Sequence, residues 1–438
     1  MRKKEFGWTR RQAMVGAATS AVSGVGLCGT IVAVAARGHE LSEQPIKAVR
    51  VGTPIVVPDN TGDTWVAAWA DDGSLYTPSN DTGGFHSKEV LIDLLPELSP
   101  EQKARLKNDD ESVWKETSEE QQRRIREQGP VSTIAFNRVF GSDPLTLAGE
   151  TINWMKDFSA QDRGGREVID YFGKRTETSA DGCTWKSSGC AFIDGALCWV
   201  IARHTYGELS GDPHLRQTAV NASLIKSTDY GKTWSRSAEE NLRTPMFPGS
   251  QFSAPYFIDY GRNRIAADGA DRFVYAISNN GFWDNGDRLI LGRIPRERIG
   301  LLSGADWEFL AAPNGSTESW TSQVTKARPI LERAGSFGMS GVAYLPARGR
   351  YMLIGWHYPA GGGKIKDAHT KTMWEFYESP KPWGPWTRIG SQVWSPQGYY
   401  CPCICPRFQS ADRIYVVTAG DWTNSSVYRL TLVPVGLV

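Results

Sequence analysis

Two aspartates at one end of an expected hairpin are the side chains of this chain best placed to do chemistry. Asp63 precedes an apolar run from Trp65 to Ala70, and Asp81 follows a second run from Ser74 to Thr77. Between the runs, Asp72-Gly73 is typical of a tight turn that needs positive φ. Because antiparallel strands return the chain to its starting end, we expect Asp63 and Asp81 at the same edge. Two carboxylates at one edge could be a catalytic pair that cleaves a glycosidic bond.

The same aspartates also have a structural interpretation. Aspartate is common in turns because its side chain accepts hydrogen bonds from nearby backbone N–H groups. Asp63, Asp72 and Asp81 could each do no more than shape a loop, and the hairpin alone leaves both interpretations open.

The composition indicates an aromatic-rich β protein. The 438 residues include 45 Gly, 17 Trp, 15 Tyr and 16 Phe, and 22% are charged. The net charge of +1 provides no overall field for nucleic acid or an anionic membrane. We expect a monomer with a polysaccharide partner, which aromatic faces and hydrogen bonds can recognise, and with no cofactor or metal.

Residues 1–40 have the pattern of an export signal. Thr9-Arg10-Arg11-Gln12 precedes a weakly apolar run from Ala13 to Ala36, which resembles a twin-arginine signal. Ala33-Val34-Ala35 offers a cleavage site, and an uncleaved N-terminal membrane anchor is the alternative. We therefore expect a periplasmic or secreted domain over residues 41–438.

Cysteine usage fits an exported domain. Apart from Cys28 in the signal segment, the number of cysteines is even, which favours disulfides in an oxidising compartment. The alternation of three cysteines from Cys401 to Cys405 would place their sulfurs on one strand face, where a soft metal is the alternative. The candidates for disulfides are Cys183, Cys190, Cys198, Cys401, Cys403 and Cys405.

Residues 97–128 interrupt the β pattern. Ser99 is expected to cap a helix that begins at Pro100, with Gln102 three residues after the cap. Ser118 and Gln121 have the same capping pattern. Charged side chains dominate this segment, so we expect a solvated helical hairpin inserted into a β domain.

A loose repeat recurs along the β part of the chain. An apolar stretch, a turn and an aromatic-bearing strand appear in five units, which suggests blades around an axis. We expect an all-β fold, a five-bladed β-propeller, with a sixth blade possible between the first two markers. The aromatic markers are Tyr76, Trp199, Tyr275, Tyr351 and Tyr415.

One repeat contains an Asp box. Residues 227–234, STDYGKTW, fit the pattern S-x-D-x-G-x-T-W, and residues 179–185 look like a version one residue short. This motif resembles the Asp box of sialidases and other propellers, where it is structural. Asp229 is expected to bond the turn around Gly231, and Trp234 to pack between strands.

Several motifs together resemble a known family. They are GDTWVAAWADDGSLYT with Asp81, STDYGKTW, FVYAISNNGFWDNGDRLILGRIPRERI, FYESPKPWGPWTRI, and a closing strand pair up to Ala419-Gly420-Asp421. They are similar to the exported bacterial propellers of the domain-of-unknown-function 4185 family, which includes endo-D-arabinanases. The resemblance spans residues 51–437. It implies a five-bladed glycoside hydrolase whose catalytic acids match Asp63 and Asp81.

The chain departs from that family at three places. It has Asn80-Asp81-Thr82 where the family usually has G-D-G, cysteines in the closing strand, and the helical insertion. The substrate could therefore differ from arabinan, and activity could be lost.

Other polar residues are candidates for substrate contacts. A propeller gathers strand ends around its axial mouth, and the repeat places these residues near such ends or turns. Trp283 and Trp422 could stack against sugars, although each candidate could also be structural. The polar candidates are Asp72, His204, Asp271, Arg272, Asn280, His357 and Asp421.

Two other function classes remain open. A polysaccharide lyase could use His204 with Tyr206, or His357 with Tyr358, to remove a proton beside a uronate carboxylate. Arg203 or Arg272 could bind that carboxylate. A non-catalytic glycan-binding propeller would use the aromatics and no acid pair.

Overall fold

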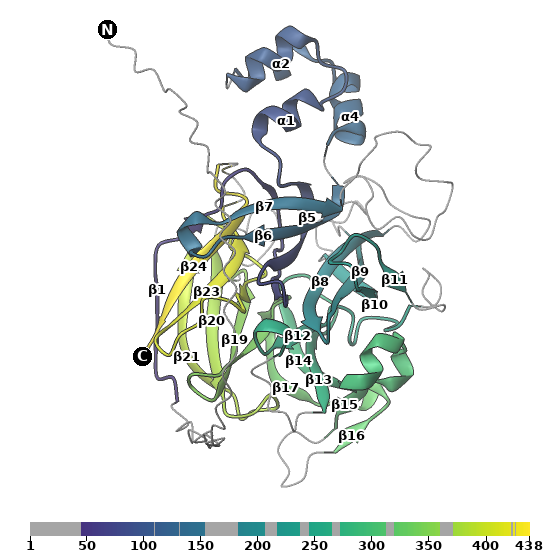
Figure 1. Ribbon diagram of the computed structural model, residues 1–438, viewed down its shortest axis with the longest axis vertical. Helices are drawn as coiled ribbons and strands as arrows, with labels where there is room; N and C mark the ends of the chain where they lie inside the picture. Colours follow the sequence, from purple (N-terminus) through teal and green to yellow (C-terminus); the bar gives the residue numbers. More distant parts are fainter. Residues whose placement is uncertain are drawn as a thin grey trace, which may run out of the picture. The chain divides into compact units, whose positions relative to one another are not determined.

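A computed structural model describes most of the chain after residue 44 (Figure 1). The described ranges are 45–108, 110–130, 132–153, 183–205, 217–236, 245–264, 272–311, 319–359, 371–421, 424 and 426–438. The fold is mostly β with few helices. The expected export signal, Cys28, Tyr206, Asp271 and Trp422 lie outside the described residues, as does the start of the short Asp box.

The first sheet contains the hairpin with the two aspartates. Its order is β3-β5-β6-β7, with β4 also paired to β5. Its strands are β3 Thr61–Asp63, β4 Ala68–Trp69, β5 Leu75–Gly84, β6 Ser132–Phe140 and β7 Ala148–Asn153.

The second sheet is antiparallel, with the order β8-β9-β10-β11. Every residue of β8 is buried, so this strand lies in the core. The strands are β8 Thr184–Ile193, β9 Ala196–Thr205, β10 Thr218–Ser227 and β11 Ser235–Arg236.

A ten-stranded sheet follows, made of two antiparallel runs joined by the parallel pair β12 and β18. The first run contains β12 Tyr256–Asp259, β13 Phe273–Asn279, β14 Gly286–Pro295, β15 Glu308–Leu310 and β16 Trp320–Thr321, with β17 Pro329–Phe337 paired to β14. The second run contains β18 Val342–Leu345, β19 Arg350–His357, β20 Thr372–Ser379 and β21 Thr387–Trp394.

The last sheet joins the two ends of the described chain. Its order is β22-β23-β24-β1, and β2 also pairs with β24. Val49 lies opposite Leu437, so an N-terminal strand completes a C-terminal sheet. The strands are β22 Cys403–Ile404, β23 Arg413–Ala419, β24 Leu430–Leu437, β1 Val49–Val51 and β2 Ile55–Val56.

Contacts between sheets link neighbours in sequence. β8 touches β5 on one side and β12 on the other, β22 touches β18 and β19, and β3 touches β23 and β24. One large hydrophobic core runs through these sheets and includes the fully buried Trp65, Trp199, Trp356 and Trp374. The inner strands thereby hold residues far apart in sequence in fixed relative positions.

The helical segment is longer than the predicted insertion over residues 97–128, since it begins with α1 at Lys88, and it contains four α-helices among the described residues in place of a simple hairpin (Figure 1). Ser99 and Ser118 are N-caps with capping boxes, as predicted. The helices surround a small cluster of their own, which includes Leu106 and Val113, because a short amphipathic helix needs an apolar partner. They are α1 Lys88–Asp93, α2 Pro100–Lys107, α3 Val113–Glu116 and α4 Glu119–Gln128.

Short 3₁₀ turns connect other elements. They are η1 Pro144–Thr146, η4 Arg262–Arg264, η5 Arg296–Leu301, η6 Gly304–Asp306 and η7 Val324–Lys326. No helix within the described ranges is both long enough and apolar enough to span a membrane.

The Asp box forms the turn expected of it. Asp229 accepts hydrogen bonds from the backbone N–H and the hydroxyl of Thr233, at 2.9 and 2.7 Å. Gly231 has φ of 87°, which the turn requires. Trp234 packs on Phe136 and Trp199, with ring centroids 4.8 and 5.2 Å apart. The motif is structural here.

The predicted disulfides are wrong. The six candidate cysteines are buried, and none of them forms a disulfide in the part of the chain that the structure describes: Cys183, Cys190, Cys198, Cys401, Cys403 and Cys405.

Strand geometry explains why these cysteines do not pair. Cys190 lies one position out of register with Cys198, which opposes Ala191, so alternation points the two side chains to opposite faces. Cys401, Cys403 and Cys405 do not lie on one regular strand as the alternation predicted, because β22 contains only Cys403 and Ile404 and Cys401 has φ of 48°. The thiols pack as small apolar groups.

Candidate functional site

The hairpin brings the two aspartates to one edge, as the turn predicted. Gly73 has φ of 85° in the turn, and Ala68 opposes Tyr76 on the two strands. Further along the pair, Asp63 on β3 opposes Asn80 on β5. Asp81 is therefore the next residue beyond the position opposite Asp63.

The backbone is irregular at this point. The register of β3 and β5 shifts between Thr61 and Asp63. Non-glycine residues with positive φ are uncommon, yet Thr64 and Asp81 have φ of 48° and 44°. In a regular strand Asn80 and Asp81 would face opposite sides, and the unusual conformation at Asp81 breaks that alternation.

Asp63 is a buried carboxylate surrounded by hydroxyl groups. Tyr400 and Tyr428 donate hydrogen bonds to its Oδ2, at 2.6 and 2.5 Å, and their two hydroxyl oxygens lie next to each other. Thr64 donates to its Oδ1 at 3.0 Å. The side chain of Asp63 comes from the first sheet and both tyrosines precede strands of the last sheet, so the site lies where these sheets meet.

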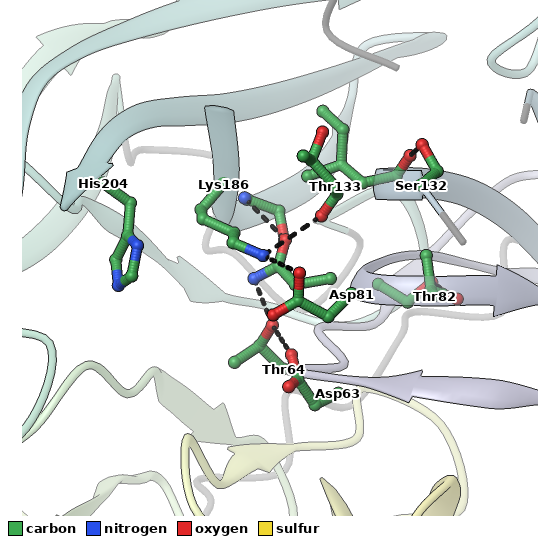
Figure 2. Close-up of polar contacts among 12 residues, drawn as sticks. Asp63, Thr64, Asp81, Thr82, Ser132, Thr133, Lys186 and His204 are labelled. Atoms are coloured by element: carbon green, nitrogen blue, oxygen red, sulfur yellow. Dashed lines mark hydrogen bonds and ion pairs between the residues drawn. The ribbon is translucent and has the colours of Figure 1, made fainter. Parts of the chain in front are cut away.

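Asp81 forms an ion pair with Lys186 of β8 (Figure 2). The side chain of Lys186 is only 2% exposed, and that of Asp81 is 15% exposed. The ammonium also donates to the carbonyl oxygen of Thr133 at 3.4 Å. A buried ammonium on the neighbouring sheet therefore meets the second carboxylate.

The surroundings give Asp63 a raised pKa. Burial is the largest cause, and the nearby charge of Asp81 adds to it. The positive charge of Lys186 and the hydrogen bonds from Tyr400 and Tyr428 oppose this effect. The pair is thus coupled, and loss of a proton from one acid affects the other.

Asn80 connects the site to the second sheet through hydrogen bonds of its side chain. Its side-chain amide donates to the hydroxyl of Thr64, and its Oδ1 accepts from the backbone N–H and hydroxyl of Ser187, at 2.9 and 2.8 Å. This bridge links Asp63, through Thr64, to the strand that contains Lys186 (Figure 2).

His204 lies beside the acids but is deeply buried. It is 1% exposed, its Nε2 lies 3.2 Å from Oε1 of Gln217, and its ring packs edge-on against Trp283. Burial and the charge of Lys186 lower its pKa to about 3. Trp283 itself is only 8% exposed, which leaves little ring surface for a sugar.

The other predicted contact residues have structural partners or lie apart from the acids. Asp72 is at the turn, where it accepts from the Ser74 N–H at 2.8 Å and the Tyr76 hydroxyl at 3.0 Å. Asn280 donates a hydrogen bond to the side chain of Asp287 in β14 at 3.1 Å. Arg272 is exposed, and its carbonyl oxygen accepts from the backbone N–H of Arg296.

His357 and Asp421 complete the predicted set. His357 ends β19, and burial together with Arg333 and Arg388 lowers its pKa to about 4. Asp421 forms a β-bridge with Gly398. Burial, and after it the charge of Asp421, raises the pKa of Tyr399, which directly precedes the site residue Tyr400.

Three site residues were missed by sequence reasoning: Lys186, Tyr400 and Tyr428. They lie 105, 337 and 365 positions from the aspartates they contact, and no local pattern links such distant residues. Within the part of the chain that the structure describes, no group of three or more His, Cys, Asp or Glu side chains could hold a metal ion.

Comparison with known proteins gives only distant matches. No family model and no curated protein matches the sequence. A putative hydrolase from Bacteroides ovatus is 14% identical, with a TM-score of 0.47 and 87% of each chain covered. The GH43_1 enzyme from Xanthomonas citri in complex with xylotriose is 11% identical, with a TM-score of 0.40 over 88% of this chain and 89% of that one.

Bacillus subtilis levansucrase in complex with oligosaccharides is 10% identical, with a TM-score of 0.40 over 91% of this chain and 87% of that one. The chain is therefore distantly similar in structure to glycoside hydrolases. Similarity at this level identifies neither a substrate nor catalytic residues.

Proposed function

We propose that this protein is an exported glycoside hydrolase that cleaves a polysaccharide with Asp63 and Asp81. The observation that carries the proposal is the coupling of two carboxylates in different surroundings: Asp63 is buried among hydroxyls, and Asp81 is paired with an ammonium. Pairs of acids whose environments separate their pKa values are the usual means of general acid and base catalysis in glycosidases.

The fold we infer around this site is a five-bladed β-propeller. Five antiparallel runs of strands follow one another in the chain. Each run contacts the next one, and the contact is made by the first strand of a run or by a strand next to it. Contacts of β3 with β23 and β24 bring the last run back to the first. The pairing of β1 with β24 would fasten such a ring between its ends.

The chemistry assigned to the pair is cleavage by water. One acid gives a proton to the glycosidic oxygen as the bond to the anomeric carbon breaks. The other either removes a proton from the attacking water or bonds the anomeric carbon until water releases it. One water molecule is consumed in either case.

The substrate class is taken from the motif resemblance and the charge of the chain. A neutral glycan such as an arabinan suits a protein with a net charge of +1 and many aromatic residues. The twin-arginine-like pattern at residues 9–12 supports export to the periplasm or medium.

The lyase alternative has less support from the site. A base that abstracts a carbon-bound proton works best with a pKa near the working pH, whereas the pKa values of His204 and His357 are lowered to about 3 and about 4.

The test is hydrolysis of a panel of arabinans, other neutral glycans and uronate polymers. We expect the wild type to release oligosaccharides, and Asp63→Asn and Asp81→Asn each to lose activity about 100-fold or more. Asp143→Asn is the control, since Asp143 is exposed and only caps a 3₁₀ turn. Full activity in either Asp63→Asn or Asp81→Asn would reject the proposed pair.

A further inference from the structure

Lys186 is the site residue whose role the proposed function leaves open. It lies near the start of β8, in a strand buried along its whole length, and its ammonium meets the carboxylate of Asp81. Its second contact, the carbonyl oxygen of Thr133, is also on the first sheet. Both contacts aim the ammonium at the acid pair (Figure 2).

A buried ammonium requires a negative partner. Ammonium groups only donate hydrogen bonds, and an uncompensated buried charge costs several kcal/mol. At 2% exposure, water contributes little to the solvation of Lys186. The arrangement is consistent only with an ionised Asp81 facing the ammonium.

Asp63 has a different set of partners. Within the described ranges, the groups hydrogen-bonded to it are the hydroxyls of Thr64, Tyr400 and Tyr428. A hydroxyl both donates and accepts, so the same contacts hold Asp63 either as carboxylate or as carboxylic acid. Asp63 can therefore release and regain a proton without losing its neighbours.

The charged and titratable groups around the pair come from several elements. Lys186 on β8 and His204 on β9 face it from the second sheet, and Tyr428 before β24 faces it from the last. His204 is neutral at ordinary pH. Lys186 is thus the positive charge that keeps Asp81 ionised, while Asp63 can hold a proton.

We propose that Lys186 is a positioning residue that holds Asp81 as a carboxylate, which makes Asp81 the base or nucleophile and Asp63 the proton donor. This assignment rests on the proposed hydrolase function. The proton of the Asp63 carboxyl passes to the glycosidic oxygen as the C–O bond breaks. On the first route Asp81 takes a proton from the attacking water, and that proton then passes from Asp81 through solvent to restore Asp63. On the second route Asp81 bonds the anomeric carbon, and Asp63 takes a proton from the water that displaces Asp81.

The leaving group of the substrate distinguishes the two roles. A proton donor is dispensable when the leaving group is already a weak base, whereas a base or nucleophile is needed for every substrate. The polysaccharide panel identifies the sugar that is released. The probes are two aryl glycosides of that sugar, one with 2,4-dinitrophenol and one with an alkyl-substituted phenol as the leaving group.

With full-length protein, Asp63→Asn should keep kcat/KM on the dinitrophenyl glycoside, which reports the bond-breaking step, within about 10-fold of wild type and lose about 100-fold or more in kcat/KM on the poor leaving group. Asp81→Asn and Lys186→Met should each lose about 100-fold on both. Lys226→Met is the control and should retain wild-type kcat/KM, because it removes a partly buried lysine of β10 that donates to the backbone carbonyl oxygen of Gly300. A Lys186→Met loss confined to the poor leaving group would overturn the assignment.

A second measurement needs no substrate, so it separates failure of this assignment from failure of the hydrolase proposal. Aspartate carboxyl carbons labelled with ¹³C are titrated by NMR, with Asp63→Asn and Asp81→Asn identifying the two signals. Asp81 should ionise at lower pH than Asp63, and Lys186→Met should raise the Asp81 midpoint by about one unit or more. An unchanged Asp81 midpoint, or an Asp63 that ionises first, would refute the role of Lys186 whatever the activity assays show.

Discussion

At the scale of single residues, burial is what makes Asp63 unusual. Its carboxylate is 6% exposed, and its hydrogen-bond partners are hydroxyls, which stabilise a charge less than a cation would. Asp81, which follows the residue paired with Asp63, has an ammonium as its partner. The same residue type therefore acquires two behaviours from two environments.

The pH dependence of stability should reveal the raised pKa of Asp63. Because the native pKa lies above the unfolded value of about 3.9, the native state binds a proton first as the pH falls, and its stability relative to the unfolded chain rises. The stabilisation that protonated Asp63 gives the native state is complete at pH values below the unfolded pKa. It is lost as the pH rises through the native pKa.

Asp63→Asn removes that contribution. We expect the melting temperature of the variant, relative to wild type, to be highest at neutral pH and to fall on acidification towards pH 4, as measured by calorimetry. The control Asp143→Asn should show no such trend, because its carboxylate is exposed. A pH-independent difference between wild type and Asp63→Asn would show that Asp63 has an ordinary pKa.

At the scale of elements, local signals predicted local structure. The hairpin turn at Gly73, the caps at Ser99 and Ser118, and the turn of the Asp box each depend on residues a few positions apart, and each is confirmed. The disulfide prediction was wrong because cysteine count and alternation say nothing about which strand faces oppose each other. Lys186 was missed for the same reason, since its partner is on another sheet.

The Asp box should stabilise the fold without taking part in catalysis. Asp229→Ala removes the acceptor for both hydrogen bonds from Thr233, and we expect a loss of about 1–2 kcal/mol in the free energy of unfolding, measured with urea. The pH profile of any hydrolysis should remain that of wild type. Unchanged stability would mean that the turn forms without this side chain.

At the scale of the whole molecule, the sheets place the buried cysteines in one continuous core. Five of the six candidates, all except Cys183, have strongly suppressed ionisation, with burial raising the pKa values of Cys198, Cys403 and Cys405 to about 12. The repeat pattern predicted how many runs of strands to expect, but it could not predict which side chains would meet between them.

The thiols should react only when this core opens. In a Cys28→Ser background, without reductant, the native protein should react slowly with Ellman's reagent, and the guanidinium-unfolded protein should release one equivalent for each of the six cysteines. Fewer thiols after unfolding would mean that some of the six cysteines form disulfides after all.

The most direct test of the central claim is the mass of the products formed in water enriched in ¹⁸O. If Asp63 and Asp81 catalyse hydrolysis, each cleaved bond gives a product that has gained one water molecule with a single heavy oxygen, and the Asp63→Asn and Asp81→Asn variants give almost none. Unsaturated products without added oxygen, or labelled products that persist in both variants, would contradict the account.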